Sequence, residues 1–334
     1  MKILIAGCGS IGTRHLKNLQ SLNAGELIVF DTDAERSRKA AETYGVRVVT
    51  GFTEALAEQP DAVLICTPTS LHIDYALSAA RNGCHLFIEK PISHSLDRLG
   101  ELISTSSQNV ILIGCNFRFH GGMELVRQLI EDKKIGRVLF ADAEFGQYLP
   151  DWHPWEDYRR GYSANKSLGG GIILDSIHEL DYLYWLFGKA DEVNCTAGKL
   201  SGLDIDVEDY AEIIIGFGSG TIARVHLDYL QRPYARTLKV VGESGTIEWD
   251  FADNLVRWYN GDEKAWNDYR PETADNINEM YIREMEHFLR CIEGKETPMA
   301  NAQDGKLILE IALAARQSAE TRQRIKLSDE GKTK

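Results

Sequence analysis

Three ionisable side chains follow a run of glycines in the middle of the chain. Gly169–Gly171 lead into an apolar segment that carries Asp175, His178 and Asp181 at steps of three. At this spacing the three side chains share one face of a helix. Ionisable groups among apolar neighbours are costly unless they are paired or functional, and imidazole suits proton transfer near neutral pH. The pattern predicts a proton-transfer site, and the alternative is a capping Asp175 beside a buried, satisfied His178.

A second candidate is the lysine of Glu89-Lys90-Pro91. The preceding residues, 84–88, have the composition of a buried strand. Because proline restricts the residue before it, Lys90 is expected to leave the strand end in an extended conformation with its direction set. Its ammonium group suits the stabilisation of a developing negative charge. Spacing alone leaves open whether Lys90 acts in catalysis or is an ordinary surface lysine.

Aromatic and polar residues elsewhere are candidates for ligand binding. The segment 148–160 precedes the glycine run and includes Trp152 and Tyr158, which are suited to stacking on a ligand ring and bonding its hydroxyls. The alternative is a surface loop that packs on a sheet or on another subunit. Asn116 and Arg118 follow a predicted strand and are placed either for substrate binding or for domain packing. Arg118 suits a carboxylate or a phosphate.

The first thirty-one residues contain the elements expected to position this chemistry. The apolar run Lys2–Ala6 is too short for a helix and ends in the glycine turn Gly7–Gly12. A helical pattern follows over Thr13–Leu22, and a second apolar run, Leu27–Phe30, stops at Asp31. Strand, glycine turn, helix, strand and acid in this order predict a dinucleotide-binding unit. The alternative is a structural turn without a ligand.

Each part of the turn has a physical task. Gly7 permits the tight turn, Gly9 lets the backbone approach the pyrophosphate, and Gly12 lets the helix pack closely on its strand. The N–H groups at the helix start, around Ser10 and Ile11, and the positive end of the helix dipole favour phosphate binding.

The acid after the second strand indicates the cofactor. Asp31 lies roughly 20 residues after the glycine turn, where a carboxylate accepts hydrogen bonds from the adenosine ribose. It would repel the 2′-phosphate of NADP, so NAD is favoured over NADP. Arg36 and Arg38 are candidates for binding that phosphate, but their pattern is typical of solvated positions on the following helix.

Strands alternate with helices up to about residue 119, which predicts an α/β domain with a doubly wound parallel sheet. Asp31, Thr67, Lys90 and Asn116 each follow a predicted strand. Ligands bind at this carboxyl edge in such sheets. We expect strands at 2–6, 27–30, 46–49, 61–66, 84–88 and 110–114, and helices at 13–22, 34–44, 53–58, 71–82 and 96–106.

The pattern changes beyond residue 120. Alternating apolar and polar residues replace the buried runs, which predicts an α+β domain over 120–327 with a large, mostly antiparallel open sheet. A polar tail, 328–334, follows. We expect strands at 138–145, 192–199, 210–217, 221–229, 236–241 and 245–251, and helices at 123–132, 174–187, 278–293 and 305–322.

Composition limits the class of protein. A chain of 334 residues favours two domains, and a net charge of −13 argues against a nucleic-acid partner. No stretch approaches the roughly 20 apolar residues of a membrane helix, and no signal peptide is visible. No metal-ligand cluster stands out. The six scattered cysteines predict buried free thiols in the cytoplasm.

Together these motifs resemble one family: glucose-fructose oxidoreductase / inositol dehydrogenase / rhizopine catabolism, called Gfo/Idh/MocA. The resemblance covers nearly the whole chain. It implies a Rossmann domain, a C-terminal domain with a large open sheet, and a homodimer or homotetramer built through that sheet. It also implies NAD(P)-dependent hydride transfer at a carbon of a sugar, nucleotide sugar, sugar acid or cyclitol. The matching segments are Gly7–Gly12, Thr67-Pro68 with His72 beyond, Glu89-Lys90-Pro91, 169–178 and Gly242–Ile247.

The resemblance also implies roles for single residues. Lys90 matches the lysine that contacts the reacting oxygen, Asp175 the aspartate that orients the substrate, and His178 the proton-transfer histidine. Glu89 matches an acid near the nicotinamide ribose, and we assign Thr67, Pro68 and His72 to the cofactor site and Asp181 to the substrate site. The family commonly separates the aspartate and the histidine by four positions, whereas here the step is three.

Two other interpretations remain at this point. One is a non-catalytic sensor that binds NAD with the same fold, although it would not need Lys90, Asp175 and His178 together. The other is a dehydrogenase of a non-carbohydrate substrate such as biliverdin or a dihydrodiol. Those relatives need no histidine in this helix, so His178 favours a sugar-like substrate.

Overall fold

The chain forms two compact units, which we describe separately. Unit 1 consists of Met1–Asn116 with Asn278–Lys306, and unit 2 of Phe117–Ile277 with the chain from Leu307 onward. The boundary expected after residue 119 is close to the observed one. The computed structural model describes residues 1–152, 154, 156–271 and 277–327.

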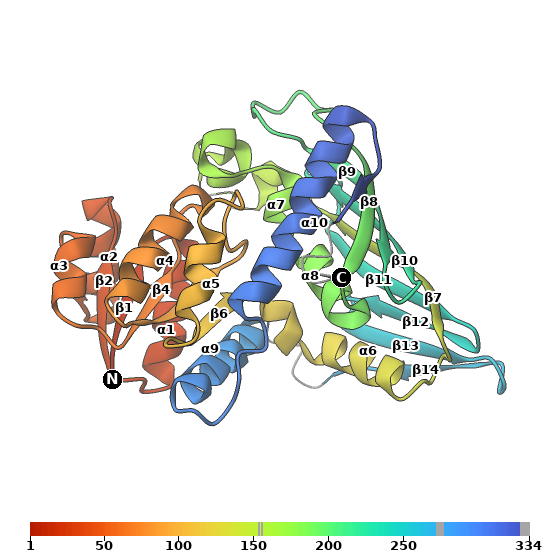
Figure 1. The fold of residues 1–334 in the computed structure, drawn as a ribbon, viewed down its shortest axis with the longest axis horizontal. Coiled ribbons are helices and arrows are strands. Elements are labelled where there is room, and N and C mark those ends of the chain that lie inside the picture. The colour runs from red at the N-terminus through yellow and green to blue at the C-terminus, as the bar shows by residue number, and fades with distance from the viewer. Residues whose placement is uncertain (153, 155, 272–276, 328–334) are drawn as a thin grey trace, which may run out of the picture. The chain divides into compact units, whose positions relative to one another are not determined.

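Unit 1 is built on a six-stranded parallel sheet in the order β3-β2-β1-β4-β5-β6 (Figure 1). Its strands are β1 (Lys2–Ala6), β2 (Glu26–Phe30), β3 (Arg47–Val48), β4 (Ala62–Ile65), β5 (His85–Glu89) and β6 (Ile111–Gly114). Its helices are α1 (Ser10–Ser21), α2 (Ala34–Tyr44), α3 (Phe52–Ala57), η1 (Thr69–Leu71), α4 (His72–Arg81), α5 (Leu99–Thr105) and α9 (Asn278–Ile292).

The parallel sheet follows from strands that are apolar along their length. Ile3, Leu4 and Ile5 in β1 are completely buried, as is the whole of β4. Strands buried on both faces are typical of parallel sheets covered by helices on both sides. The strand order reverses between β1 and β4, so the ligand crevice of such a fold lies at their carboxyl ends. This confirms the predicted doubly wound domain.

Helix α9 departs from the expected domain division. We expected all of 120–327 to form the second domain, but Asn278–Lys306 belongs to unit 1. Helix α9 packs on α1, and the ring of Phe288 lies edge-on to Phe87 of β5 with 5.8 Å between ring centroids. An apolar helix face shows that the helix packs on something but not on which sheet.

Unit 2 contains a nine-stranded sheet in the order β14-β13-β12-β11-β7-β10-β9-β8-β15, antiparallel except for the pair β7 and β10. Its strands are β7 (Val138–Gly146), β8 (Ala190–Gly198), β9 (Tyr210–Phe217), β10 (Ile222–Asp228), β11 (Ala235–Gly242), β12 (Gly245–Asp250), β13 (Leu255–Asn260), β14 (Ala265–Tyr269) and β15 (Ile325–Lys326). Its helices are η2 (Asn116–Phe119), α6 (Gly121–Glu131), η3 (Leu149–Asp151), η4 (Tyr158–Arg160), η5 (Tyr162–Ala164), η6 (Lys166–Leu168), α7 (Ile172–Asp175), α8 (His178–Phe187) and α10 (Ala302–Thr321), the last from Leu307 onward.

One face of this sheet is covered and the other is open. In β7 the side chains of Ala141, Ala143 and Phe145 are buried, and Asp142 and Glu144 alternate with them. Helices α6, α7 and α8 contact the sheet, and Figure 1 shows them on one side of it. The strand pairing confirms the predicted mostly antiparallel open sheet, and the alternation shows that one of its faces is covered.

Strands β13, β14 and β15 were missed by the sequence patterns. Strand β14 is mostly exposed and lacks apolar alternation, and β15 has only two residues. Their pairing depends on a neighbouring strand rather than on their own composition.

The helix expected over 174–187 is interrupted. Helix α7 ends at Asp175 and α8 begins at His178, with Ser176 outside helical geometry at φ −94° and ψ 39°. Asp175 therefore does not continue the face formed by His178 and Asp181, and the single-face arrangement predicted from the spacing is wrong for Asp175.

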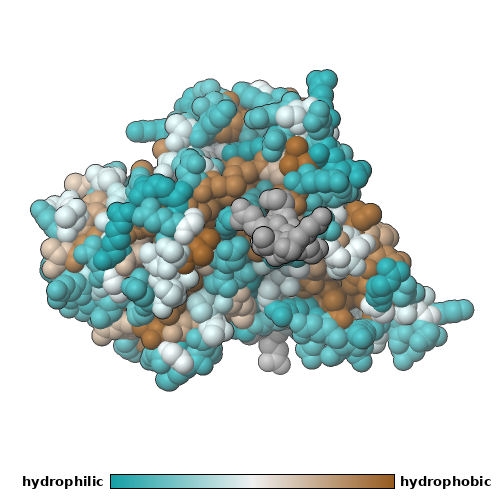
Figure 2. Space-filling view, viewed as in Figure 1, coloured by the Kyte–Doolittle hydropathy of each residue, from teal (hydrophilic) through white to brown (hydrophobic). Residues whose placement is uncertain are grey.

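The surface is mainly polar. Figure 2 shows one face on which hydrophilic residues predominate, with hydrophobic residues in smaller patches between them. None of the helices in the described ranges has both the length and the apolar character that crossing a membrane requires. All six cysteines are buried free thiols, as predicted.

Candidate active site

The glycine turn of unit 1 has the expected division of tasks. Gly7 has φ +100°, and a Cβ atom there would lie 2.4 Å from the carbonyl oxygen of Cys66. A Cβ on Gly12 would lie 1.9 Å from the carbonyl oxygen of Gly7. Around Gly9, by contrast, the described residues leave open space within 4 Å of such an atom. The turn thus requires two glycines for its own packing and leaves the third position clear for a pyrophosphate.

The start of α1 suits the same ligand. Gly9 is its N-cap, and no side chain of the described residues caps it. The N–H groups of the first turn, which includes Ser10 and Ile11, are those that bind phosphate at such a helix start.

Asp31 is fixed beside this turn. Its Oδ2 accepts the N–H of Cys8 at 2.7 Å, and its Oδ1 accepts the N–H of Asp33 at 2.8 Å. The arginines of α2 are directed to acids of the same helix region: Arg36 Nε lies 3.7 Å from Asp33, and Arg38 pairs with Glu35 and Glu42 at 2.6 Å each. A carboxylate without an attendant arginine favours NAD over NADP.

Glu89 is directed into unit 1. Its Oε1 lies 2.6 Å from Nε2 of His15, and its Oε2 accepts the N–H of Lys90 at 3.3 Å. Glu89 is 8% exposed and His15 is fully buried. The resemblance implied an acid near the nicotinamide ribose, but here both carboxylate oxygens are engaged inside the unit. Sequence reasoning missed His15, although its place one turn after Gly12 was visible.

His72 joins two loops at the carboxyl edge of the sheet. Its Nδ1 lies 2.8 Å from the carbonyl oxygen of Pro91, and its Nε2 lies 2.8 Å from that of Thr67. Burial lowers the pKa of His72, although both carbonyls act in the opposite direction. Its buried ring connects the loops after β4 and β5. Pro68 precedes η1 in the first of these loops.

Two residues predicted to bind substrate instead pair with each other. Nη2 and Nε of Arg118 lie 2.7 Å and 3.0 Å from Oδ1 of Asp181, and the two side chains are 2% and 0% exposed. Neither is open to a ligand, because both are buried, and the buried charge of Asp181 in the first turn of α8 requires the opposite charge of Arg118. Asn116 is buried in unit 1, where its Nδ2 lies 3.5 Å from the sulfur of Met280.

Asp175 is held by two phenols. The hydroxyl of Tyr229 donates to its Oδ2 at 3.0 Å, and the hydroxyl of Tyr162 donates to its Oδ1. Asp175 is 4% exposed. Burial and the neighbouring Asp175 raise the pKa of Tyr229 well above its ordinary value, which keeps the phenol protonated as a donor. Sequence reasoning missed both tyrosines.

The glycine run Gly169–Gly171 makes room for the contact between Tyr162 and Asp175. A Cβ on Gly170 would lie 2.0 Å from the carbonyl oxygen of Tyr162, and one on Gly171 would lie 2.5 Å from the ion pair of Arg316 and Glu208. The glycines therefore permit a close approach of the chain's own backbone and side chains. It lets residues 162–165 lie against α7, where Tyr162 meets Asp175.

The aromatic segment before the glycine run is partly described. The indole N–H of Trp152 donates to the carbonyl of Gln147 at 3.1 Å, and its ring lies edge-on to Tyr229 at 5.3 Å. The hydroxyl of Tyr158 accepts the N–H of Asp204 at 3.2 Å. Trp152 thus supports the tyrosine that binds Asp175. His153 and Trp155 of this segment lie outside the described residues.

His178 begins α8 beside a buried cation. Its ring lies edge-on to Phe117 at 5.1 Å. The guanidinium of Arg236 lies 4.4 Å from the centre of Phe117 and donates to buried Glu179 at 2.8 Å. Burial acts to lower the pKa of Arg236, but Glu179 together with Tyr234 and Tyr182 outweighs this effect, and the pKa is raised. The ion pair and the aromatic ring fix the start of α8.

Two sequence profiles of known families match the chain. Residues 1–117 match "Oxidoreductase family, NAD-binding Rossmann fold", and residues 123–248 match "GFO/IDH/MocA C-terminal domain". The chain belongs to the Gfo/Idh/MocA family. Its first domain is therefore that of an oxidoreductase with an NAD-binding Rossmann fold.

Relatives align over nearly the whole length. Myo-inositol 2-dehydrogenase of Thermotoga maritima is 29% identical over 98% of this chain and 99% of its own. Scyllo-inositol 2-dehydrogenase (NAD(+)) of Bacillus subtilis is 26% identical over 95% and 94%. The structure of levoglucosan dehydrogenase with NADH and levoglucosan superposes with a TM-score of 0.89 at 19% identity, covering 98% of this chain and 100% of that one. It shows a shared fold.

This Gfo/Idh/MocA chain accommodates the short step between Asp175 and His178 by ending one helix and starting another. Asp175 is the last residue of α7 and accepts hydrogen bonds from Tyr162 and Tyr229, whereas His178 is the first residue of α8 and contacts Phe117. The two candidate catalytic residues of unit 2 therefore have separate supports.

Proposed function

We propose that this enzyme transfers hydride between NAD and a hydroxyl-bearing carbon of a sugar, nucleotide sugar, sugar acid or cyclitol. The inositol dehydrogenases among its relatives support this substrate class. The observation that carries the proposal is the fixed carboxylate of Asp175, which accepts two tyrosine hydroxyls a short step before His178. A bound polyol presents hydroxyl groups to be oriented and one proton to be removed.

Residues of unit 1 bind the nucleotide. Gly9 and the start of α1 bind the pyrophosphate, and Asp31 accepts hydrogen bonds from the ribose. Bound NAD supplies a hydride acceptor for the carbinol carbon. These residues orient the cofactor and select it against NADP.

Two other residues accept the hydroxyl proton and stabilise the negative charge of the alkoxide. His178 accepts the hydroxyl proton as the alcohol is oxidised, and the ammonium of Lys90 stabilises the developing alkoxide. Asp175 orients the substrate by accepting from its hydroxyls beside the two phenols. In the reverse direction His178 returns the proton to the carbonyl oxygen.

A substrate panel tests the proposal. Purified enzyme with NAD is offered inositols, hexoses, hexuronic acids and nucleotide sugars, and NADH formation is followed by absorbance. We expect turnover with members of this panel and little with NADP. Turnover confined to alcohols that are not polyols, or none while NAD binds, would contradict it.

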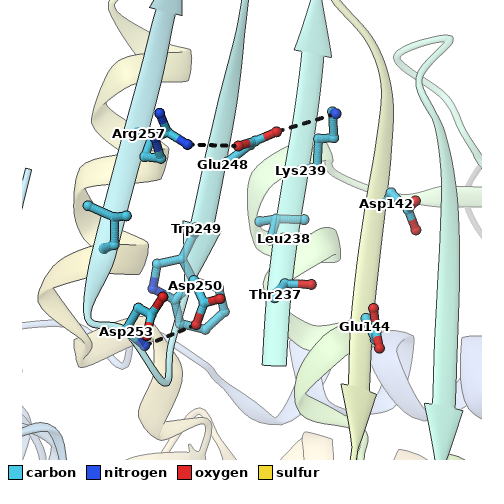
Figure 3. A pocket seen from close by; sticks show the side chains of 11 residues that line it. Asp142, Glu144, Thr237, Leu238, Lys239, Glu248, Trp249, Asp250, Asp253 and Arg257 are labelled. Carbon is cyan, nitrogen blue, oxygen red and sulfur yellow. Dashed lines mark hydrogen bonds and ion pairs between the residues drawn. The ribbon is translucent and has the colours of Figure 1, made fainter. Parts of the chain in front are cut away.

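We further propose that the open sheet face joins two copies of the chain, as a homodimer or as half of a homotetramer. The large apolar residues Phe140 and Ile222 are 46% and 54% exposed and pair side by side on β7 and β10. Beside them charges of alternating sign cross the strands, and Figure 3 shows Glu248 between Arg257 and Lys239. An apolar row beside alternating charges suits a second copy of the same surface.

Single substitutions test this surface. Phe140→Lys or Ile222→Lys is expected to shift the enzyme to monomers in light-scattering measurements. The matched control is Leu200→Lys, because Leu200 is 66% exposed but lies outside the sheet strands. A wild-type protein that is monomeric, or surface variants that associate like wild type, would contradict the proposal. The buried thiols support a cytoplasmic location, which we also propose.

A further inference from the structure

A buried imidazole contacts Glu89, the residue before the proposed active-site lysine, and takes no part in the mechanism above. His15 is on α1, and its ring is fully buried. Its Nε2 lies 2.6 Å from Oε1 of Glu89, while its Nδ1 has no hydrogen-bond partner among the described residues. Glu89 is therefore the polar group that binds this ring.

Aromatic neighbours hold the imidazole in place. The ring of Phe87 lies edge-on to His15 at 4.9 Å, and the ring of Tyr281 at 6.0 Å. The guanidinium of Arg14 lies 4.5 Å from the centre of the Tyr281 ring. Packing of this kind restricts rotation of the ring, so its contact with Glu89 is fixed.

The second oxygen of Glu89 continues the contact to Lys90. Oε2 accepts the backbone N–H of Lys90 at 3.3 Å. The carboxylate of Glu89 packs closely against Gly114. A Cβ atom at Gly114 would lie only 3.2 Å from Cδ of Glu89, so a larger residue would crowd the carboxylate. The carboxylate is thus held at both oxygens, and the backbone at Lys90 depends on its position.

His15 also belongs to the helix whose start binds the nucleotide. Gly9 is the N-cap of α1, and His15 lies in the second turn of the same helix. A continuous set of contacts therefore leads from the pyrophosphate turn through His15 and Glu89 to the amide of Lys90. We propose that His15 is a positioning residue that couples occupation of the nucleotide turn to the placement of Lys90. This inference rests on the proposed role of Lys90.

Removal of the imidazole gives a defined result. In His15→Phe, Oε1 of Glu89 loses its partner while Oε2 keeps only the N–H of Lys90, and a buried carboxylate with one oxygen unpaired turns away or takes up a proton. We expect kcat to fall by about tenfold to a hundredfold while KM for NAD stays near the wild-type value. His15→Gln keeps an N–H near the position of Nε2 and should recover most of kcat. His15→Asn is too short to reach Glu89 and should not.

A matched control exists in the same unit. His287 is also buried and contacts a carboxylate, with 2.5 Å between Nδ1 and Oε2 of Glu296. His287→Phe removes a pair of the same kind outside the proposed path, so kcat should stay near wild type. Equal losses in His15→Phe and His287→Phe would show a general structural effect and overturn the proposal.

Amide exchange tests the coupling without turnover. We expect NADH to slow hydrogen exchange at the amide of Lys90 in wild type, His15→Gln and His287→Phe, but not in His15→Phe. The same slowing in His15→Phe would overturn the proposal. If His15→Phe does not fold, the kcat values of His15→Gln and His15→Asn test the proposal instead. Equal kcat values for these two variants would overturn the proposal. If the wild-type enzyme shows no turnover, the proposed function is contradicted. The exchange measurement would still test whether NADH binding is coupled to the placement of Lys90.

Discussion

The side chains proposed to act on the substrate are positioned by buried neighbours distant in the sequence. Asp175 accepts hydroxyls from Tyr162 and Tyr229, and His178 precedes Glu179, which forms a buried ion pair. A site must hold its groups to within a fraction of an ångström for efficient chemistry. At the scale of the residue, function thus depends on these supports as well as on the reacting groups.

Loss of either reacting group should reduce turnover without releasing the cofactor. For His178→Ala and Lys90→Met we expect kcat to fall by about 10²–10⁴-fold, since each removes one acid–base or charge-stabilising group. The dissociation constant of NADH should change little, because the nucleotide turn is intact. Steady-state kinetics and a fluorescence titration measure the two quantities. His287→Phe, which removes a buried imidazole outside the proposed active site, is the matched control, and wild-type turnover in either active-site variant would refute the assignment.

Asp31 should determine the choice of nucleotide. In Asp31→Ser the ribose loses a charged acceptor, so we expect affinity for NAD to fall by about tenfold to a hundredfold and discrimination against NADP to shrink. Calorimetric titration with both nucleotides measures this. Glu35→Gln removes a charge from the exposed part of α2 and should leave both affinities unchanged. An Asp31→Ser enzyme that still excludes NADP as strongly as wild type would show another determinant.

At the scale of the element, the glycine turn joins β1 to α1 under two different constraints. Gly12 is required by packing, because its Cβ would meet the carbonyl oxygen of Gly7, whereas Gly9 faces open space. The same residue type therefore serves the fold at one position and the ligand at the other.

These constraints predict opposite phenotypes for two alanine substitutions. Gly12→Ala should lower the free energy of unfolding by about 1–3 kcal/mol through overpacking. Gly9→Ala should leave that free energy within about 0.5 kcal/mol of wild type and weaken NADH binding, since the methyl group occupies the space for the pyrophosphate. Urea unfolding and NADH titration separate the two effects. Equal stability of both variants would contradict the packing argument.

The strands and helices of unit 1 were predictable because each is specified by its own residues. Buried apolar runs identified β1, β2 and β4, and helix α2 begins and ends at the expected residues. The break between α7 and α8 was not predictable, because both segments retain helical composition. It depends on contacts such as that of Asp175 with Tyr229, which lies 54 residues further along the chain.

The same reason explains which site residues were missed. Local spacing and the family resemblance predicted Lys90, Asp175 and His178 as site residues, but the partner of Glu89 is 74 residues away at His15. Arg118 and Asp181 were predicted to bind substrate because each is a charged residue in a suitable segment. Only the fold shows that they form a buried pair.

At the scale of the whole molecule, the open sheet face of unit 2 concentrates ionisable groups. His226 lies 2.7 Å from Glu212 and 2.8 Å from Asp228, and Arg224 lies 3.0 Å from Asp142. The hydrogen bond with Asp228, opposed by burial and aided by Glu212, raises the pKa of His226 to about 9. Its ordinary value is 6.5, so the folded protein binds this proton more tightly than the unfolded chain does.

Stability should therefore depend on pH through His226. The charged imidazole stabilises the fold fully below pH 6.5, and this contribution is lost as the pH rises toward 9. We expect His226→Gln to lower the free energy of unfolding by about 1–2 kcal/mol at pH 6 and by less at pH 9.5. Urea unfolding at both pH values measures the difference. A pH-independent effect would contradict the assigned charge state.

The central claim is direct hydride transfer from a polyol carbon while His178 removes the hydroxyl proton. The most direct measurement uses the best substrate of the panel, deuterated at the reacting carbon, and follows the label by mass spectrometry in a single turnover. The account predicts deuterium in the reduced nucleotide, a slower rate than with the unlabelled substrate, and loss of transfer in His178→Ala. Deuterium released to water with unlabelled NADH, or undiminished transfer in His178→Ala, would contradict it.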